Sequence, residues 1–257
     1  MSSPISAEFH RPARISPFVP VGILERVGIK LCIVGNAVVR LFGSDLVMAD
    51  LDLAISDEQF DLALSVLHDE GFRDVDFGPG HLVFLPVLGK PGGWVACRLQ
   101  FPSSPEYVVL SLASCWNLEI NPDTTFYPCP GYRFPRFLAY LEALICTIDA
   151  LVSVGDNPSL PRYQYAIMMV LLEKRPELEG MVSPGDQFFM DFFMKQRARS
   201  GELRVLELRK GIMAGTISVD AARAVVPRPD LSRRRIKEKY LRQGMGGGNG
   251  QGSTPVA

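Results

Sequence analysis

This 257-residue chain lacks an excess of charge of either sign, since 27 Lys and Arg stand against 28 Asp and Glu, a net charge of −1. No overall field therefore draws the protein to nucleic acid or to a membrane surface, and we expect neither as a partner. With 47% hydrophobic and 21% charged residues, the composition is that of a globular protein. The chain is long enough to bury a sizeable core.

Cysteine is scarce and widely spaced. No two of the five cysteines have the spacing of zinc ligands, and their odd number argues against a disulfide framework. We expect buried structural thiols in a reducing, cytoplasmic protein. The residues are Cys32, Cys97, Cys115, Cys129 and Cys146.

Targeting and membrane segments are also missing. Residues 1–20 contain no continuous apolar run, and their four prolines interrupt any amphipathic presequence helix. We predict a flexible N-terminal segment there. The most apolar helical stretch, 137–154, contains Glu142 and Asp149, which favours a buried core helix over a membrane span.

Several widespread site motifs do not occur, namely a Walker loop, a dinucleotide fingerprint and Gly-x-Ser-x-Gly. His68 and His81 have no second ligand at metal-binding spacing, so both are interpreted as structural. Lys90 lies in a glycine- and proline-rich stretch without the Ser or Thr and the helix of a phosphate loop, which favours a hairpin turn.

What is present is a pair of aspartates on a predicted strand, 50–55. Successive side chains of a strand alternate faces, so Asp50 and Asp52 share one face, about 6.6 Å apart at their origins. Two carboxylates at this spacing can converge on one cation. Mg²⁺ is favoured, because it binds through one or two carboxylates and substrate phosphates.

A second feature precedes these acids. The apolar run 31–34 ends at Gly35-Asn36, and a helix is predicted over 37–42. Glycine allows a tight turn and close backbone approach, and the amides that begin the helix would face an anion such as a phosphate. Gly43-Ser44 is a second candidate pair, and Ser44 is kept as a possible contact to phosphate.

Together these residues resemble the signature of the nucleotidyltransferase superfamily, with its DNA polymerase beta-like fold, and more narrowly the branch of AbiEii and the aminoglycoside nucleotidyltransferases. Val34-Gly35-Asn36 is followed by thirteen residues and then by Asp50-Leu51-Asp52-Leu53. The resemblance implies that Gly35 and Asn36 contact the triphosphate of an ATP-like NTP and that Asp50 and Asp52 hold catalytic Mg²⁺.

Two readings of the function stay open. In the first, the protein is a transferase that moves a nucleoside monophosphate from an NTP to a hydroxyl of a small molecule or protein. In the second, it is a catalytically inactive nucleotide-binding protein or interaction scaffold. Asn36 stands where the family has Gly or Ser, and no acid lies inside the later predicted strands, which favours the second reading. Their interiors offer Arg98, Gln100 and Ser111 instead, while Asp76 and Glu106 lie at strand ends.

The remaining pattern predicts an α+β fold with a mixed sheet flanked by helices, followed by a C-terminal helical region. Ser56 and Gln59 have the spacing of a capping box for a helix that ends at Gly71. Strands are predicted at 74–77, 81–87, 94–101 and 107–112, a loop at 117–133, and helices at 135–154, 162–175, 187–209 and 219–225.

We divide the chain accordingly into a flexible segment at 1–20, an α/β domain at 21–130, a helical region at 131–243 and a disordered glycine-rich tail at 244–257. Most aromatic side chains of the helical region are interpreted as core: Tyr163, Tyr165, Phe188, Phe189, Phe192 and Phe193. The basic stretch 228–242 is interpreted as a solvated helix.

Overall fold

A computed structural model describes residues 16–46, 50–77, 94–102, 104–156, 158–195 and 202–226. The chain forms two compact units, 1–186 and 187–257, and each is described by itself.

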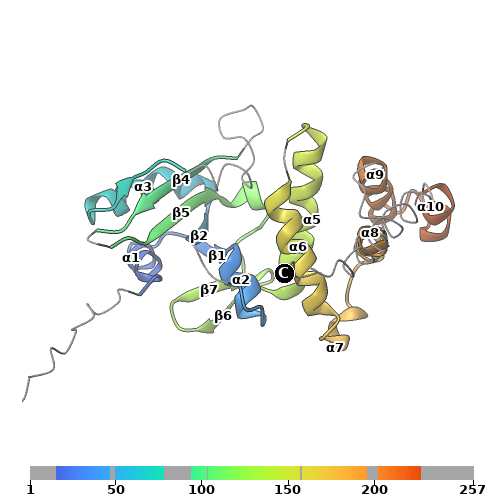
Figure 1. Cartoon of the computed structure of the whole chain (residues 1–257), viewed down its shortest axis with the longest axis horizontal. Coiled ribbons are helices and arrows are strands. Elements are labelled where there is room, and N and C mark those ends of the chain that lie inside the picture. Colours follow the sequence, from blue (N-terminus) through green and yellow to red (C-terminus); the bar gives the residue numbers. More distant parts are fainter. Residues whose placement is uncertain are drawn as a thin grey trace, which may run out of the picture. The chain divides into compact units, whose positions relative to one another are not determined.

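The first unit is built on a five-stranded sheet with the order β1-β2-β5-β4-β3 (Figure 1). Strand β1 (Leu31–Val34) is antiparallel to β2 (Leu51–Ile55), which is parallel to β5 (Tyr107–Leu112). Strand β4 (Ala96–Gln100) runs antiparallel to β5, and β3 (Arg73–Asp74) pairs with β4 at the edge. The predicted mixed sheet of an α+β fold is confirmed.

One face of this sheet is apolar and fully covered. Leu51, Leu53 and Ile55 of β2 are at most 1% exposed. Helix α3 (Phe60–Asp69) packs against β5 and against α1 (Val19–Arg26). Helix α1 also contacts β1. This burial fixes the register of β2, because a slip by one residue would turn its aspartates into the core.

The start of α3 differs from the prediction. A 3-10 turn at Asp57–Gln59 precedes the helix, and the Ser56 hydroxyl donates to Glu58 instead of capping. Gln59 is drawn to the neighbouring turn, where its side chain accepts from the Lys30 amide at 2.7 Å and donates to the Gly28 carbonyl. The capping-box prediction is therefore wrong.

The end of α3 agrees with the prediction. Gly71 has a φ of +89°, and its amide bonds to the His68 carbonyl. The Phe72 amide reaches the Leu67 carbonyl at 3.0 Å, which completes a Schellman motif.

The predicted loop at 117–133 is also wrong in part, since it contains most of a hairpin. Strand β6 (Thr125–Cys129) pairs with β7 (Tyr132–Pro135), and Gly131 supplies the positive φ of the connecting turn. The register shifts between Phe126 and Cys129, which accommodates a proline in β6. Strand β7 lies against β1, so the hairpin packs beside this edge of the five-stranded sheet.

Helices α5 (Phe137–Ser153), α6 (Ser159–Leu172) and α7 (Pro176–Glu179) complete the first unit. Helices α5 and α6 pack side by side (Figure 1). The buried residues of α5 include Leu144 and Ile148, both 0% exposed, which confirms the predicted core helix. Among the described helices, none combines the length and apolarity needed to cross a bilayer.

The second unit contains α8 (Pro184–Lys195), which begins three residues before it, α9 (Glu202–Met213) and α10 (Val219–Val225). The single predicted helix at 187–209 is therefore two, since α8 ends at Lys195 and α9 begins at Glu202. Of the six aromatic residues interpreted as core, Tyr165, Phe188, Phe189 and Phe192 are buried, whereas Tyr163 is 45% exposed.

Several sequence-based expectations lie outside the described residues: the flexible segment up to residue 15, the strand at 81–87, the turn at Lys90, the basic stretch 228–242 and the tail 244–257. The predicted domain boundary after residue 130 stays a prediction, although α5 and α6 belong to the same compact unit as the sheet.

Candidate functional site

The two aspartates lie at the start of β2, on the sheet face opposite to its apolar core. Asp52 is paired with Val109 of β5, which is paired with Arg98 of β4, so these three side chains form one row across the sheet. Asp50 immediately precedes the first residue of β2 and continues the same face. The structure thus brings the predicted acids together on one surface.

Gly35 joins this surface from the end of β1. Its φ of +70° and ψ of −146° place it in a region that other residues rarely adopt. A Cβ built on Gly35 would lie 2.1 Å from Oδ2 of Asp52 and 2.8 Å from its Cγ. The backbone of the turn therefore packs directly on the Asp52 carboxylate, and any side chain at position 35 would displace it.

The Gly35 amide is held by α5. It donates a 3.0 Å hydrogen bond to the Tyr140 hydroxyl, which in turn donates to Oε1 of Gln164 on α6 at 2.5 Å. Burial is the main cause that raises the pKa of Tyr140 well above its usual value, so the hydroxyl keeps its proton. This buried chain fixes the turn to the helical part of the unit, and it removes one amide from those available to a phosphate.

Asn36 and Ser44 differ in their surroundings. Asn36 is the first residue of α2 (Asn36–Leu41), and its Oδ1 is buried without a hydrogen-bond partner. An orphaned buried acceptor next to the Asp52 turn has unused capacity for a ligand donor. Ser44 follows α2, and its Oγ accepts from the Leu46 amide at 3.3 Å, so a local turn engages this hydroxyl.

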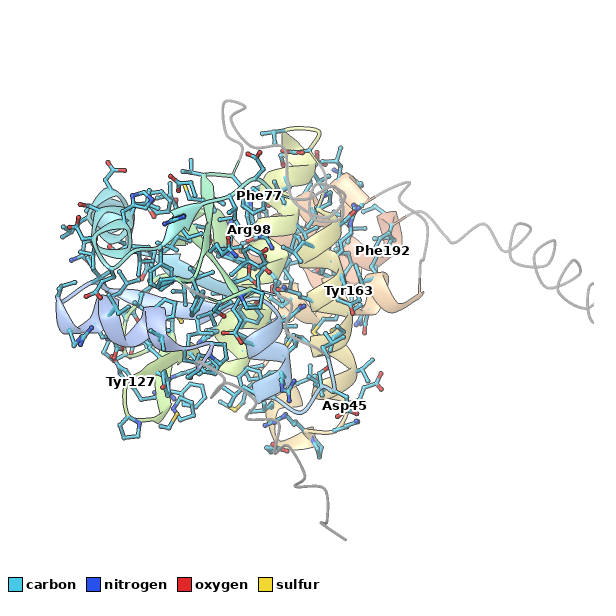
Figure 2. The ribbon with its side chains drawn as sticks, turned by 60° about the vertical axis from the view of Figure 1, so that its left-hand side comes forward. Asp45, Phe77, Arg98, Tyr127, Tyr163 and Phe192 are labelled. Atoms are coloured by element: carbon cyan, nitrogen blue, oxygen red, sulfur yellow. The ribbon has the colours of Figure 1, made fainter. Side chains whose placement is uncertain are left out.

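Asp50 already has a cationic partner, Arg98. The guanidinium binds both carboxylate oxygens, with Nε to Oδ2 at 2.7 Å and a terminal nitrogen to Oδ1 at 3.2 Å. The side chains of Arg98 and Asp50 are only 10% and 7% exposed. Arg98 also lies over the Tyr107 ring, 3.6 Å from its centroid. Figure 2 shows the Arg98 side chain among those of the sheet. Sequence reasoning named Arg98 as a strand residue and missed this role.

Asp52 has a different charge state. Burial, followed by the nearby Asp50 charge, raises the pKa of Asp52 from 3.8 to about 7. The protonated form of Asp52 is therefore populated near neutral pH. In the ligand-free protein, one negative charge is therefore balanced by Arg98 and the other is partly removed by a proton.

No third acid joins the pair on the described strands. The face of β5 that carries Val109 also carries Tyr107 and Ser111, and the described residues contain no cluster of three or more metal-binding side chains. Glu106 precedes β5 with the parity of the opposite face. Asp76 contacts the site through its backbone, since its carbonyl accepts a hydrogen bond from Arg98 at 3.4 Å.

The oxygen donors of this surface match the ligand preference of Mg²⁺. Two carboxylates on one face, beside the unpaired Asn36 Oδ1, are hard oxygen donors of the type that Mg²⁺ accepts together with phosphates and water. The residue types therefore fit one cation. Both Asp50 oxygens are engaged by Arg98, however, so a cation at this pair of acids would have to compete with the guanidinium.

Aromatic residues close the far end of the site face. Trp116 donates from its indole nitrogen to the Ser111 hydroxyl at 2.8 Å, and its ring contacts those of Trp94 and Tyr140. These buried rings pack on the same face of the sheet at Ser111, beyond Val109 along β5.

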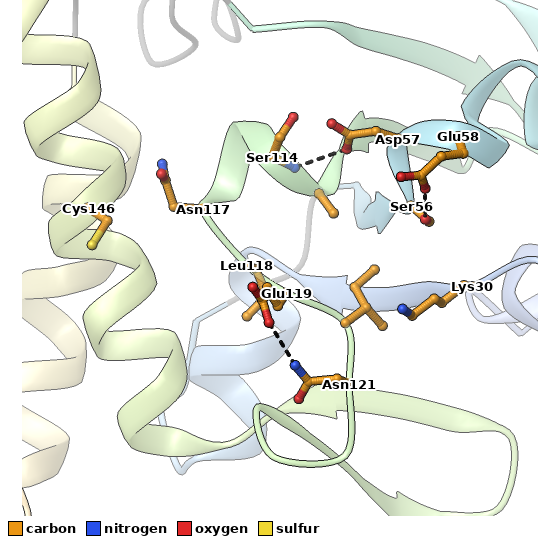
Figure 3. A pocket seen from close by; sticks show the side chains of 12 residues that line it. Lys30, Ser56, Asp57, Glu58, Ser114, Asn117, Leu118, Glu119, Asn121 and Cys146 are labelled. Carbon is orange, nitrogen blue, oxygen red and sulfur yellow. Dashed lines mark hydrogen bonds between the residues drawn. The ribbon is translucent and has the colours of Figure 1, made fainter.

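A separate cavity of about 550 Å³ lies at the carboxyl ends of β2 and β5. Ser114, whose amide donates to Asp57, and Asn121, which donates to Glu119, are among its lining residues (Figure 3). None of the five predicted site residues lines it. The sequence had no signal for it, because the lining comes from loops far apart in the chain.

Comparison with known proteins assigns the chain to no family. No family model matches the chain, and no curated protein matches it. Among solved structures, the chain is similar to one described as a tRNA nucleotidyltransferase complexed with a primer tRNA and an incoming ATP analog, at 14% identity and a TM-score of 0.26. That match covers 76% of this chain and 60% of the other, so the chain spans less than two thirds of the solved protein.

Proposed function

We propose that the protein is a nucleotidyltransferase-like transferase of the AbiEii and aminoglycoside nucleotidyltransferase type, which binds ATP or another NTP on the face of Asp50 and Asp52. It transfers the nucleoside monophosphate to a hydroxyl of a small molecule or protein. One observation carries the proposal: the Gly35 backbone lies so close to the Asp52 carboxylate that a Cβ would be 2.1 Å from it. A glycine turn in contact with an acidic strand lets phosphates and carboxylates approach a shared cation.

The residues divide the work as follows. Asp50 and Asp52 would hold Mg²⁺, which when bound neutralises phosphate charge and supplies electrostatic stabilisation. The Gly35 turn leaves room for the phosphates, Asn36 offers its unpaired Oδ1, and Ser44 would contact phosphate from the segment after α2. Tyr140 and Gln164 hold the turn in place through the Gly35 amide.

A second candidate is a nucleotide-binding protein or scaffold without catalysis. The specific observation in its favour is the buried ion pair of Arg98 with Asp50, together with Val109 as the neighbour of Asp52. An apolar residue at this place cannot accept the proton of an attacking hydroxyl. The cytoplasmic location expected from the cysteine pattern stays a prediction under both candidates.

Asp52→Asn tests the site with Asp123→Asn, an exposed aspartate of the 121–124 turn, as the matched control. We expect wild type and the control to melt at higher temperature with Mg²⁺ and an NTP, because a ligand that binds only the native state stabilises it. Asp52→Asn should lose this shift while it remains folded. An unaltered shift in Asp52→Asn would refute the assignment of the site.

Transfer of label from α-³²P-NTP to an acceptor then separates the two candidates. Transfer by wild type that is absent in Asp52→Asn supports the enzyme. A nucleotide-dependent melting shift without transfer to hydroxyl-bearing metabolites or proteins supports the non-catalytic candidate.

A further inference from the structure

Arg98 has a set of contacts that holds its guanidinium firmly at the acidic face. Two of its nitrogens bind the two oxygens of Asp50, and the third bonds to the Asp76 carbonyl at 3.4 Å. The ring of Tyr107 lies beneath it at 3.6 Å. A bidentate, stacked arginine is a fixed cation, because the planar fork matches a carboxylate and the aromatic face orients it.

The position of Arg98 follows from the sheet order. Strand β5 separates β4 from β2, so the side chain must cross β5 to reach Asp50. Val109 is directly paired with Arg98, and Tyr107 lies two residues before it on the same face. A valine and a flat ring form the path along which the long arginine stem lies. An acid in place of Val109 would instead put a third carboxylate between Asp52 and Arg98.

Both oxygens of Asp50 are thus used, and the pair is nearly buried. A cation that binds Asp50 must compete with the guanidinium for the charge of this carboxylate, and a guanidinium that gives way is left without its counter-charge. Such a displaced guanidinium needs another anion. A phosphate is suited to it, because arginine binds phosphate through the same two-pronged geometry.

We propose that Arg98 is the resident counter-ion of Asp50 and competes with divalent metal for it, so that metal binds well only when nucleotide phosphate takes over the guanidinium. The proposal rests on the proposed function for the identity of the anion. Metal and nucleotide then bind cooperatively. Phosphate that binds Arg98 frees Asp50 for the metal, and metal that binds Asp50 frees Arg98 for the phosphate. The competition itself involves only Arg98, Asp50 and the metal.

Titration of purified protein with Mn²⁺ alone, followed by the electron paramagnetic resonance of free Mn²⁺, tests the competition without any nucleotide. Arg98→Gln should bind Mn²⁺ at least about tenfold more tightly than wild type, the equivalent of one charge-assisted hydrogen bond released. Arg204→Gln is the matched control, because it removes an arginine from an exposed ion pair with Glu207, and it should equal wild type. Asp50→Asn/Arg98→Gln should lose the gain.

Arg98→Lys covers the case in which Arg98→Gln does not fold, as judged by circular dichroism. Lysine keeps the charge but cannot bind both Asp50 oxygens at once, so a smaller gain in Mn²⁺ affinity is expected. A folded Arg98→Gln, or otherwise a folded Arg98→Lys, with the Mn²⁺ affinity of wild type would overturn the proposal.

A second titration includes a non-hydrolysable NTP analogue. In wild type the analogue should tighten Mn²⁺ binding severalfold, and in Arg98→Gln this coupling should shrink. A gain in Arg98→Gln with no effect of any analogue on either protein would support the competition at Asp50 and contradict the nucleotide-binding function. The two failures are therefore distinguishable.

Discussion

Replacing Gly35 with alanine should destabilise the first unit through two separable effects. The first is the backbone, since φ is +70° and ψ is −146° in a region that costs about 1–3 kcal/mol for residues other than glycine. The second is the contact with Asp52, whose Oδ2, Cγ and Cβ would lie 2.1, 2.8 and 2.9 Å from the new Cβ. Forcing such an overlap costs typically about 1–3 kcal/mol more. The expected total is about 2–6 kcal/mol.

Gly155 provides the control for the backbone effect. Its φ is also +70°, but nothing lies within 4 Å of a Cβ built there. Gly155→Ala should therefore lose only the conformational part, about 1–2 kcal/mol. Urea unfolding followed by circular dichroism gives both free energies, provided that the slope against denaturant is unchanged.

A double mutant identifies the contact that causes the difference. Gly35→Ala/Asp52→Gly removes the atoms that the new Cβ would meet, so it should be less destabilised than the sum of its two single mutants, a coupling expected for residues in direct contact. Equal losses in Gly35→Ala and Gly155→Ala, or additive effects in the double mutant, would refute the close packing of the turn on Asp52.

Two further predictions concern the same buried groups. In protein kept metal-free with chelator, Asp52 favours folding fully below pH 3.8 and loses this contribution as pH rises through about 7, because its pKa is raised in the folded state. The change is at most about 4 kcal/mol. Denaturation at pH 5 and pH 8 should therefore show Asp52→Asn gaining stability relative to wild type at the higher pH, and no change in that difference would contradict the raised pKa. Tyr140→Phe leaves the Gly35 amide and the Gln164 oxygen without their shared partner, so a loss of about 2–4 kcal/mol is expected from two buried polar groups. Tyr127→Phe removes an exposed hydroxyl that bonds to Arg133 and should change stability by no more than about 0.5 kcal/mol in the same assay.

The local part of this fold could be predicted from the sequence. Residues 31–55 form strand, turn, helix and strand within about one residue of expectation, because the apolar runs are short and the intervening spacer has the length of a helix. The alternation that put Asp50 and Asp52 on one face also fixed the opposite face as core. The helix end at Gly71 was predictable for the same reason, since a Schellman motif depends on a few consecutive residues.

Interactions between distant segments could not be predicted. Arg98 lies 48 residues after Asp50, and the two meet only because β5 enters the sheet between their strands. Gln59 has the right spacing to cap its own helix, yet it bonds to a turn 29 residues earlier. The hairpin of β6 and β7 was not predicted because its prolines usually indicate a loop. Its stability depends on packing beside β1, a segment distant in the sequence.

The charges of the site explain why the ligand-free sheet tolerates two acids side by side. Arg98 neutralises Asp50 through a nearly buried pair, and the raised pKa of Asp52 favours its protonated form up to near neutral pH. A cation that enters must therefore compete with a guanidinium and with a proton. Nucleotide phosphate can receive the guanidinium, whereas Val109 and Arg98, the neighbours of Asp52 in its row, cannot receive a proton from an acceptor hydroxyl. Nucleotide binding is thus the part of the proposed function that the side chains support most directly, and transfer requires that Asp52, once freed of its own proton, also serve the acceptor.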